Sequence, residues 1–179
     1  MGATDPLIRL SAARLFELFE ASSPLAQRLA GEAPFESDTI LIERARAHAA
    51  ILSEPEKVQT LNAHPRIGED PARLSRRSLA EQGADALPDL AALNAEYERR
   101  FGFRFVVFVN GRSKAEIVPV LRERLRNSRE EEMGNGLEAI IAIAEARASA
   151  PSGNELDKAR SRPSEPRKGG GRRSAPEGA

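Results

Sequence analysis

His64 is the residue in this chain best suited to move protons. It is one of only two histidines and lies in the segment Ala63-His64-Pro65-Arg66-Ile67-Gly68. The residue before a proline avoids helical backbone angles, so a helix that ends near here should pass into extended chain at His64. An imidazole held in a fixed direction suits acid–base chemistry near neutral pH. The structural alternative is a histidine whose charge is favoured by the dipole at a helix C-terminus.

The motif Ser78-Leu79-Ala80-Glu81-Gln82 has two interpretations. Ser78 and Glu81 have the spacing of a capping box, in which both side chains hydrogen-bond to the first turn of a helix. Glu81 could instead orient His64 and stabilise its charged form, while Gln82 offers a ligand both a donor and an acceptor. The sequence leaves both open.

Five of the eight aromatic residues lie between Tyr97 and Phe108. The stretch from Phe103 to Val109 has the composition of a buried strand, yet no second strand is evident to pair with it. Its backbone amides and carbonyls need other partners, and a planar polar ligand could provide them. Helix ends, water or an unrecognised strand could equally do so.

Arg147 lies near the end of the last predicted helix, on the same side as apolar residues such as Ile140 and Ile143. Its guanidinium could extend to the surface, where the helix dipole favours a cation. An inward-pointing arginine would instead bind a carboxylate through two hydrogen bonds.

Amphipathic helices must position these residues. From about Leu7 to Arg147, apolar residues recur at intervals of three and four, and prolines fall between the runs. The predicted fold class is all-α: a single compact multi-helix domain with one buried extended segment at about 103–109. Two apolar stripes are expected to face the core, the first formed by Leu15, Leu18 and Phe19, the second by Ile40, Ala47 and Ile51.

Capping boxes predict that two helices begin after Ser113 and Ser128. Pro119 should kink the first of these helices or delay its start, because proline cannot donate a backbone hydrogen bond. Gly134 and Gly136 should weaken the opening of the second, so that its rigid part starts just after them.

The composition changes at the C-terminus. Residues 149–179 are rich in proline, glycine, serine and arginine and contain almost nothing to bury, so we expect a disordered tail that follows a helical domain at residues 1–148. A solvated tail is favoured over an arm that binds polyanions.

Charge and cysteine content argue against several classes of function. The 27 basic and 27 acidic residues balance, so no net field attracts nucleic acid or a membrane. The absence of cysteine excludes disulfides and thiolate chemistry, and the two histidines lack the spacing of metal ligands. With no signal peptide or membrane span evident, we expect a cytoplasmic protein that acts on a small molecule by acid–base chemistry.

In their order along the chain, these motifs closely resemble the OHCU decarboxylases, which act on 2-oxo-4-hydroxy-4-carboxy-5-ureidoimidazoline (OHCU) in urate breakdown. The resemblance covers about Leu7 to Arg147. It implies an all-helical, generally dimeric enzyme that needs no cofactor or metal and forms (S)-allantoin. It assigns catalytic roles to His64, to Glu81 as its acidic partner, and to Arg147 as the residue that holds the substrate anion. The ligand-binding positions it implies are Pro65, Ser78, Gln82 and the backbone of Phe105, Val106, Val107, Phe108 and Val109.

Three features depart from the usual family pattern, one of which is Asn135-Gly136 in the last helix. Arg66 replaces a residue that is usually acidic, and Arg104 stands where proline is frequent; both are expected to add positive charge near the site. Two alternatives remain: an inactive helical binding module with the same fold, or a related lyase or hydrolase that acts on another ureide.

Overall fold

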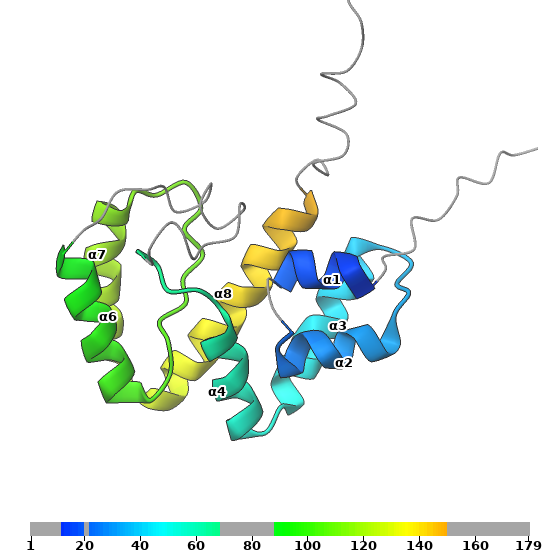
Figure 1. Cartoon of the computed structure of the whole chain (residues 1–179), viewed down its shortest axis with the longest axis horizontal. Helices are drawn as coiled ribbons and strands as arrows, with labels where there is room; N and C mark the ends of the chain where they lie inside the picture. Colours follow the sequence, from blue (N-terminus) through cyan, green and yellow to red (C-terminus); the bar gives the residue numbers. More distant parts are fainter. Residues whose placement is uncertain (1–11, 20–21, 69–87, 150–179) are drawn as a thin grey trace, which may run out of the picture. The chain divides into compact units, whose positions relative to one another are not determined.

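The computed structural model describes residues 12–19, 22–68 and 88–149. Within them the chain forms seven α-helices and no β-strand, which confirms the all-α prediction (Figure 1). Ser78, Glu81 and Gln82, and the predicted tail apart from Ser149, lie outside the described residues. The helices are α1 (Ala12–Phe19), α2 (Pro24–Glu32), α3 (Asp38–Ile51), α4 (Glu54–Ala63), α6 (Pro88–Phe101), α7 (Lys114–Arg124) and α8 (Arg129–Ser149).

Helix α8 is the central element of the core. It packs against α1, α3 and α4, while α2 contacts α1, α3 and α4 from another side. Its buried apolar residues meet the predicted stripe of α1, whose members Leu15, Leu18 and Phe19 are all buried. Of the described helices, none is long and apolar enough to cross a bilayer.

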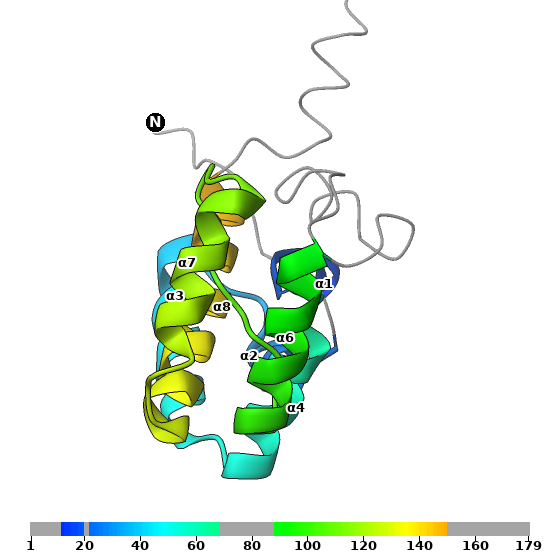
Figure 2. The same ribbon diagram turned by 90° about the vertical axis from the view of Figure 1, so that its left-hand side faces the viewer.

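Helices α6 and α7 form a pair that runs in the same direction (Figures 1 and 2). The chain that leaves α6 must therefore return along the pair before α7 can begin, and residues 102–113 make this return. This geometry explains an extended segment in a helical protein. Its side chains Phe103 and Phe105 pack around Tyr97 of α6, with ring centroids 6.1 and 5.2 Å from the tyrosine ring.

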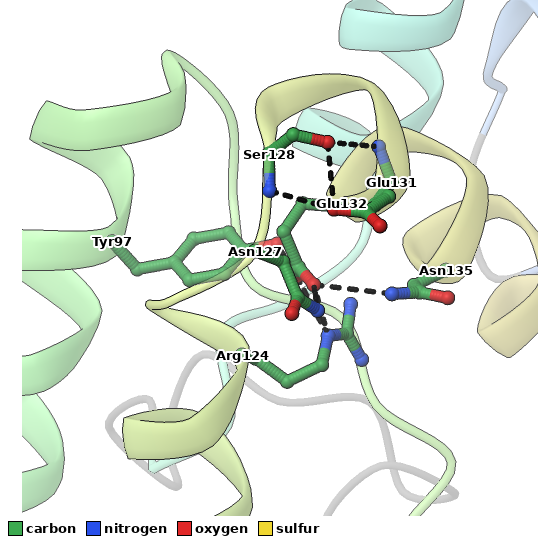
Figure 3. Close-up of polar contacts among 7 residues, drawn as sticks. All are labelled: Tyr97, Arg124, Asn127, Ser128, Glu131, Glu132 and Asn135. Atoms are coloured by element: carbon green, nitrogen blue, oxygen red, sulfur yellow. Dashed lines mark hydrogen bonds and ion pairs between the residues drawn. The ribbon is translucent and has the colours of Figure 1, made fainter.

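The fully buried carboxylate of Glu132 joins α6, α7 and α8 (Figure 3). It accepts hydrogen bonds from the Tyr97 hydroxyl, from Arg124 Nε at 2.6 and 2.8 Å, and from the side-chain amides of Asn127 at 2.7 Å and Asn135 at 3.1 Å. Burial, and then the hydrogen bond to Glu132, raises the pKa of Tyr97 far above its usual value.

The predicted stripe of α3 is wrong. Ile40 is 37% exposed and Ile51 67% exposed, and Ala47 is also exposed. The buried face of α3 is formed by Leu41, Ile42, Ala45 and Ala49, a face rotated from the predicted one. Because α3 packs between α2 and α8, both neighbours together select which apolar residues face inward.

Both predicted capping boxes are present, and the helices begin directly after them. Glu116 accepts hydrogen bonds from Ser113, and α7 starts at Lys114 and continues through Pro119, so the predicted delay of its start is wrong. Helix α8 starts at Arg129. Gly134 and Gly136 thus lie inside the helix, and the expectation that its rigid part starts just after them stays a prediction.

Gly136 is instead the residue at which α8 approaches α4. A Cβ atom placed there would lie 2.6 Å from Leu61 Cδ2, whereas a Cβ at Gly134 would meet nothing within 4 Å. Leu61 is fully buried and can move little.

We expect Gly136→Ala to destabilise the protein by about 1–2 kcal/mol, because overpacking outweighs the gain in helix propensity. The matched variant Gly134→Ala should stabilise it by about 0.5–1 kcal/mol. Urea unfolding followed by circular dichroism measures both, and equal effects of the two variants would contradict the proposed close approach.

Candidate active site

His64 ends helix α4, as the sequence predicts. Its backbone is extended (φ −75°, ψ 141°) and its N–H donates to the Leu61 carbonyl at 3.2 Å, which closes the last turn. The residue is 7% exposed. His64 is therefore a buried residue, and it stands where the chain passes from helix to loop.

The loop after His64 is held against α6 by two polar contacts. Asn94 Nδ2 donates to the Ile67 carbonyl at 2.9 Å. Arg66 forms two hydrogen bonds with Glu98, at 2.5 and 2.8 Å. The hydrogen bond from Arg66 is the main reason that the pKa of Glu98 lies below its usual value. The charge of Arg66 is thus matched by Glu98, which corrects the expectation of added positive charge at that position.

The N-terminus of α4 is fixed by the carboxylate of Glu56. It accepts hydrogen bonds from the Ser53 backbone N–H at 2.8 Å and the Ser53 hydroxyl at 2.6 Å, and it pairs with Arg28 of α2 at 2.8 Å. These contacts, the Ser53 hydroxyl first, lower the pKa of Glu56 to about 2. The helix that ends in His64 is therefore anchored at its first turn by an ionised carboxylate.

We expect Glu56 to contribute stability that depends on pH. Its pKa is lower in the folded protein than in the unfolded chain, so the contribution is complete above about pH 4.5 and is lost as the pH falls towards about 2. Glu56→Gln, which cannot ionise, should show a shallower loss of urea stability than the wild type between pH 5 and pH 3. Parallel losses in the two proteins would contradict this assignment.

The extended segment contains buried residues whose backbone groups have few hydrogen-bond partners among the described residues. Phe105 and Val106 are buried, while the next three residues are half-buried. Arg112 donates to the carbonyls of Phe108 at 2.5 Å and Val109 at 3.0 Å, so these two acceptors are already in use. Among the described residues, none hydrogen-bonds to the backbone of residues 105–107. A polar ligand could bind these groups as well as the backbone N–H groups of Phe108 and Val109.

Arg147 is 4% exposed, so its side chain does not extend to the surface. Its Nη1 donates to the Leu18 carbonyl of α1 at 3.1 Å. Along α8 it lies about three turns, roughly 16 Å, beyond Gly136, where α8 touches α4. The described contacts thus place Arg147 beside α1, and its role in holding a substrate stays a prediction.

The structure brings His64 and Pro65 together with the beginning of the extended segment. Arg104, the residue before Phe105, donates from Nη1 to the His64 carbonyl at 2.9 Å. Because Ser78, Glu81 and Gln82 are outside the described residues, their roles also stay predictions. The sequence analysis missed Asn94 and Glu98, although their spacing of four on one helix face is a signal that both side chains point the same way.

The described residues thus form a helical domain in which a buried histidine ends α4 close to an extended aromatic segment. The family model described as OHCU decarboxylase matches residues 10–149. The chain belongs to this family.

Individual relatives agree with this assignment. The chain is 30% identical over 139 residues to the 2-oxo-4-hydroxy-4-carboxy-5-ureidoimidazoline decarboxylase of Haloferax volcanii, which covers 73% of this chain and 82% of that protein. It is 31% identical over 135 residues to the uric acid degradation bifunctional protein of Bacillus sp. (strain TB-90), covering 71% of this chain and 27% of the relative. The chain thus spans about a quarter of that bifunctional protein.

Solved structures show the same fold. The crystal structure of OHCU decarboxylase in the presence of (S)-allantoin matches with a TM-score of 0.57 and 26% identity, over 75% of this chain and 94% of that one. The crystal structure of (S)-allantoin synthase matches with a TM-score of 0.58 and 26% identity, over 76% of this chain and 48% of that one.

Proposed function

We propose that this protein decarboxylates OHCU to (S)-allantoin and CO2 without a cofactor, with His64 as the acid–base residue. The observation that carries the proposal is the buried position of His64 at the end of α4, next to the extended segment. In a chain of this family, this position supports a role for His64 in proton transfer, because the backbone groups of the nearby extended segment could hold a planar ring.

The substrate itself can accept the electrons that decarboxylation releases. One ring carbon carries both the carboxylate and a hydroxyl, and its neighbour is doubly bonded to nitrogen. When the bond to the carboxylate breaks, the electron pair moves towards this C=N group, so no external electron sink is needed. CO2 leaves, and the ring nitrogen that receives the electron pair takes a proton from water. The hydroxyl then loses its proton and becomes the ring carbonyl while the neighbouring carbon gains a proton, so one proton is consumed overall.

His64 would manage both proton transfers. It would take the hydroxyl proton and deliver one to a single face of the neighbouring carbon, which sets the handedness of the product. Glu81 would orient the imidazole, and Arg147 would hold the substrate anion. Pro65, Ser78, Gln82 and the backbone of residues 105–109 would fix the ring and the ureido group.

To test this proposal, OHCU is generated from urate with a uricase and a hydroxyisourate hydrolase. The formation of allantoin is then followed by circular dichroism with and without this protein. OHCU decays spontaneously to racemic allantoin, so rapid growth of a one-handed signal is the expected result. It should persist in the presence of a metal chelator. A slow racemate that the protein does not change would favour the inactive binding module, and turnover of a different ureide would favour the related lyase or hydrolase.

Arg147→Lys tests the proposed binding of the substrate anion. Lysine keeps the charge but loses the two parallel N–H groups of the guanidinium, so we expect KM to rise about tenfold or more. Steady-state kinetics measures the change. An unchanged affinity for a carboxylate analogue of the substrate would remove Arg147 from the binding site.

The finer points of organisation are also proposals. We infer a cytoplasmic homodimer with a helical domain at residues 1–148 and a disordered tail at residues 149–179. Analytical ultracentrifugation measures the oligomeric state. Limited proteolysis should remove the tail and leave the decarboxylase activity.

A further inference from the structure

Arg104 joins the extended segment to the end of α4 through two separate hydrogen bonds. Its backbone N–H donates to Asn62 Oδ1 at 2.9 Å, and its guanidinium Nη1 donates to the His64 carbonyl at 2.9 Å. The first contact holds the last turn of α4, and the second holds the residue that ends it. The two bonds use different groups of one residue, so they also fix the position of Arg104 itself.

The position of the His64 carbonyl affects where the imidazole starts from the backbone. This oxygen belongs to the planar peptide unit between His64 and Pro65, so fixing it fixes the rotation of the backbone next to the His64 Cα atom. The direction of the Cα–Cβ bond follows from that rotation, and the two side-chain torsions place the ring from there. A guanidinium at this place also stabilises the carbonyl end of α4.

The neighbouring contacts hold a different part of the loop. Asn94 and Glu98 hold Ile67 and Arg66, which lie on the far side of Pro65 from His64. The charge of Arg104 also acts on Glu98, as the smallest of the causes that shift its pKa below the usual value.

We infer that Arg104 is a positioning residue for His64: through the His64 carbonyl and Asn62 it sets the direction of the imidazole. The inference rests on the proposed function of His64. It also gives a role to a residue that the sequence analysis treated only as added positive charge.

The first test measures kcat and KM for OHCU with the Arg104→Met variant. A ring displaced by about 1 Å should lower kcat about tenfold to hundredfold, while KM changes less than about threefold. Arg104→Lys should recover most of kcat, because an ammonium can still donate to the carbonyl. The matched control is Arg122→Met, which removes an arginine from the surface of α7, where its side chain is 60% exposed. It should leave both constants unchanged.

The second test observes His64 without substrate. The chain has two histidines, so two imidazole signals are expected in the NMR spectrum, and His48→Gln assigns them. Arg104→Met should shift or broaden the His64 signal, Arg104→Lys should restore it, and Arg122→Met should leave it unmoved. A wild-type protein that does not turn over OHCU would remove the proposed function alone, and this signal would still decide the inference.

An Arg104→Met variant with a wild-type kcat and an unmoved His64 signal overturns the inference. If the wild type does not turn over OHCU, an unmoved His64 signal in Arg104→Met is enough to overturn the inference. If Arg104→Met loses its helical circular dichroism, Arg104→Gln replaces it. Glutamine keeps a polar side chain that is too short to replace the guanidinium, so it should show the same fall in kcat and the same change in the His64 signal.

Discussion

His64→Asn is expected to lower the turnover of OHCU at least about a hundredfold and up to about ten-thousandfold, the range that a general acid–base residue contributes. Asparagine has a similar size and remains polar, but it cannot accept and return a proton. Because the backbone N–H of His64 closes the last turn of α4 whatever the side chain, the variant should fold like the wild type. The coupled assay and far-UV circular dichroism measure the two properties.

His48 provides the matched control for this variant. It is the only other histidine and lies on α3, where its Nε2 is 2.8 Å from Glu32 Oε1. His48→Gln should keep turnover close to that of the wild type. Near-normal turnover by His64→Asn, or equal losses in the two variants, would remove His64 from the mechanism.

Glu132→Ala is expected to destabilise the protein by about 3–5 kcal/mol, the typical effect of removing one partner from a buried ion pair. The carboxylate is fully buried, and the side chains around it are oriented towards it (Figure 3). Its loss would leave the Arg124 guanidinium, whose side chain is only 15% exposed, without the partner at 2.6 Å that matches its charge. The Tyr97 hydroxyl would also lose its acceptor.

Glu130→Ala is the matched control, since Glu130 is an exposed residue of the same first turn of α8. We expect its effect to stay within about 0.5 kcal/mol, as is usual for surface positions. Urea unfolding of both variants gives the comparison. A small effect of Glu132→Ala would mean that water replaces the carboxylate at little cost.

Local features of this fold could be predicted from the sequence, and features set by distant neighbours could not. The helix starts at Ser113 and Ser128 were correct because a capping box involves only residues within one turn. The inward face of α3 was wrong, because Ile40 and Ile51 are as apolar as the residues that α2 and α8 cover. Gly136 shows the same limit: its close contact with Leu61 comes from a residue far away in the sequence.

In the candidate site, too, local features could be predicted from the sequence and contacts between distant segments could not. The stop of α4 at His64 was predictable, since Pro65 restricts the residue directly before it. The contacts that Asn62, Asn94 and Glu98 make across the loop depend on how α4, α6 and the extended segment meet. The spacing of Asn94 and Glu98 shows that they share a helix face, but the sequence of one chain does not show which segment packs against that face.

The extended segment that connects α6 to α7 affects how the substrate specificity of the protein could change. In this segment the side chains Phe105 and Val106 fill the core, whereas the proposed ligand contacts are backbone groups. Most single substitutions here would therefore alter stability and leave the ligand's hydrogen-bonding partners in place. A mutational scan would score the segment as purely structural, and evolution towards another ureide would have to act at other residues of the site.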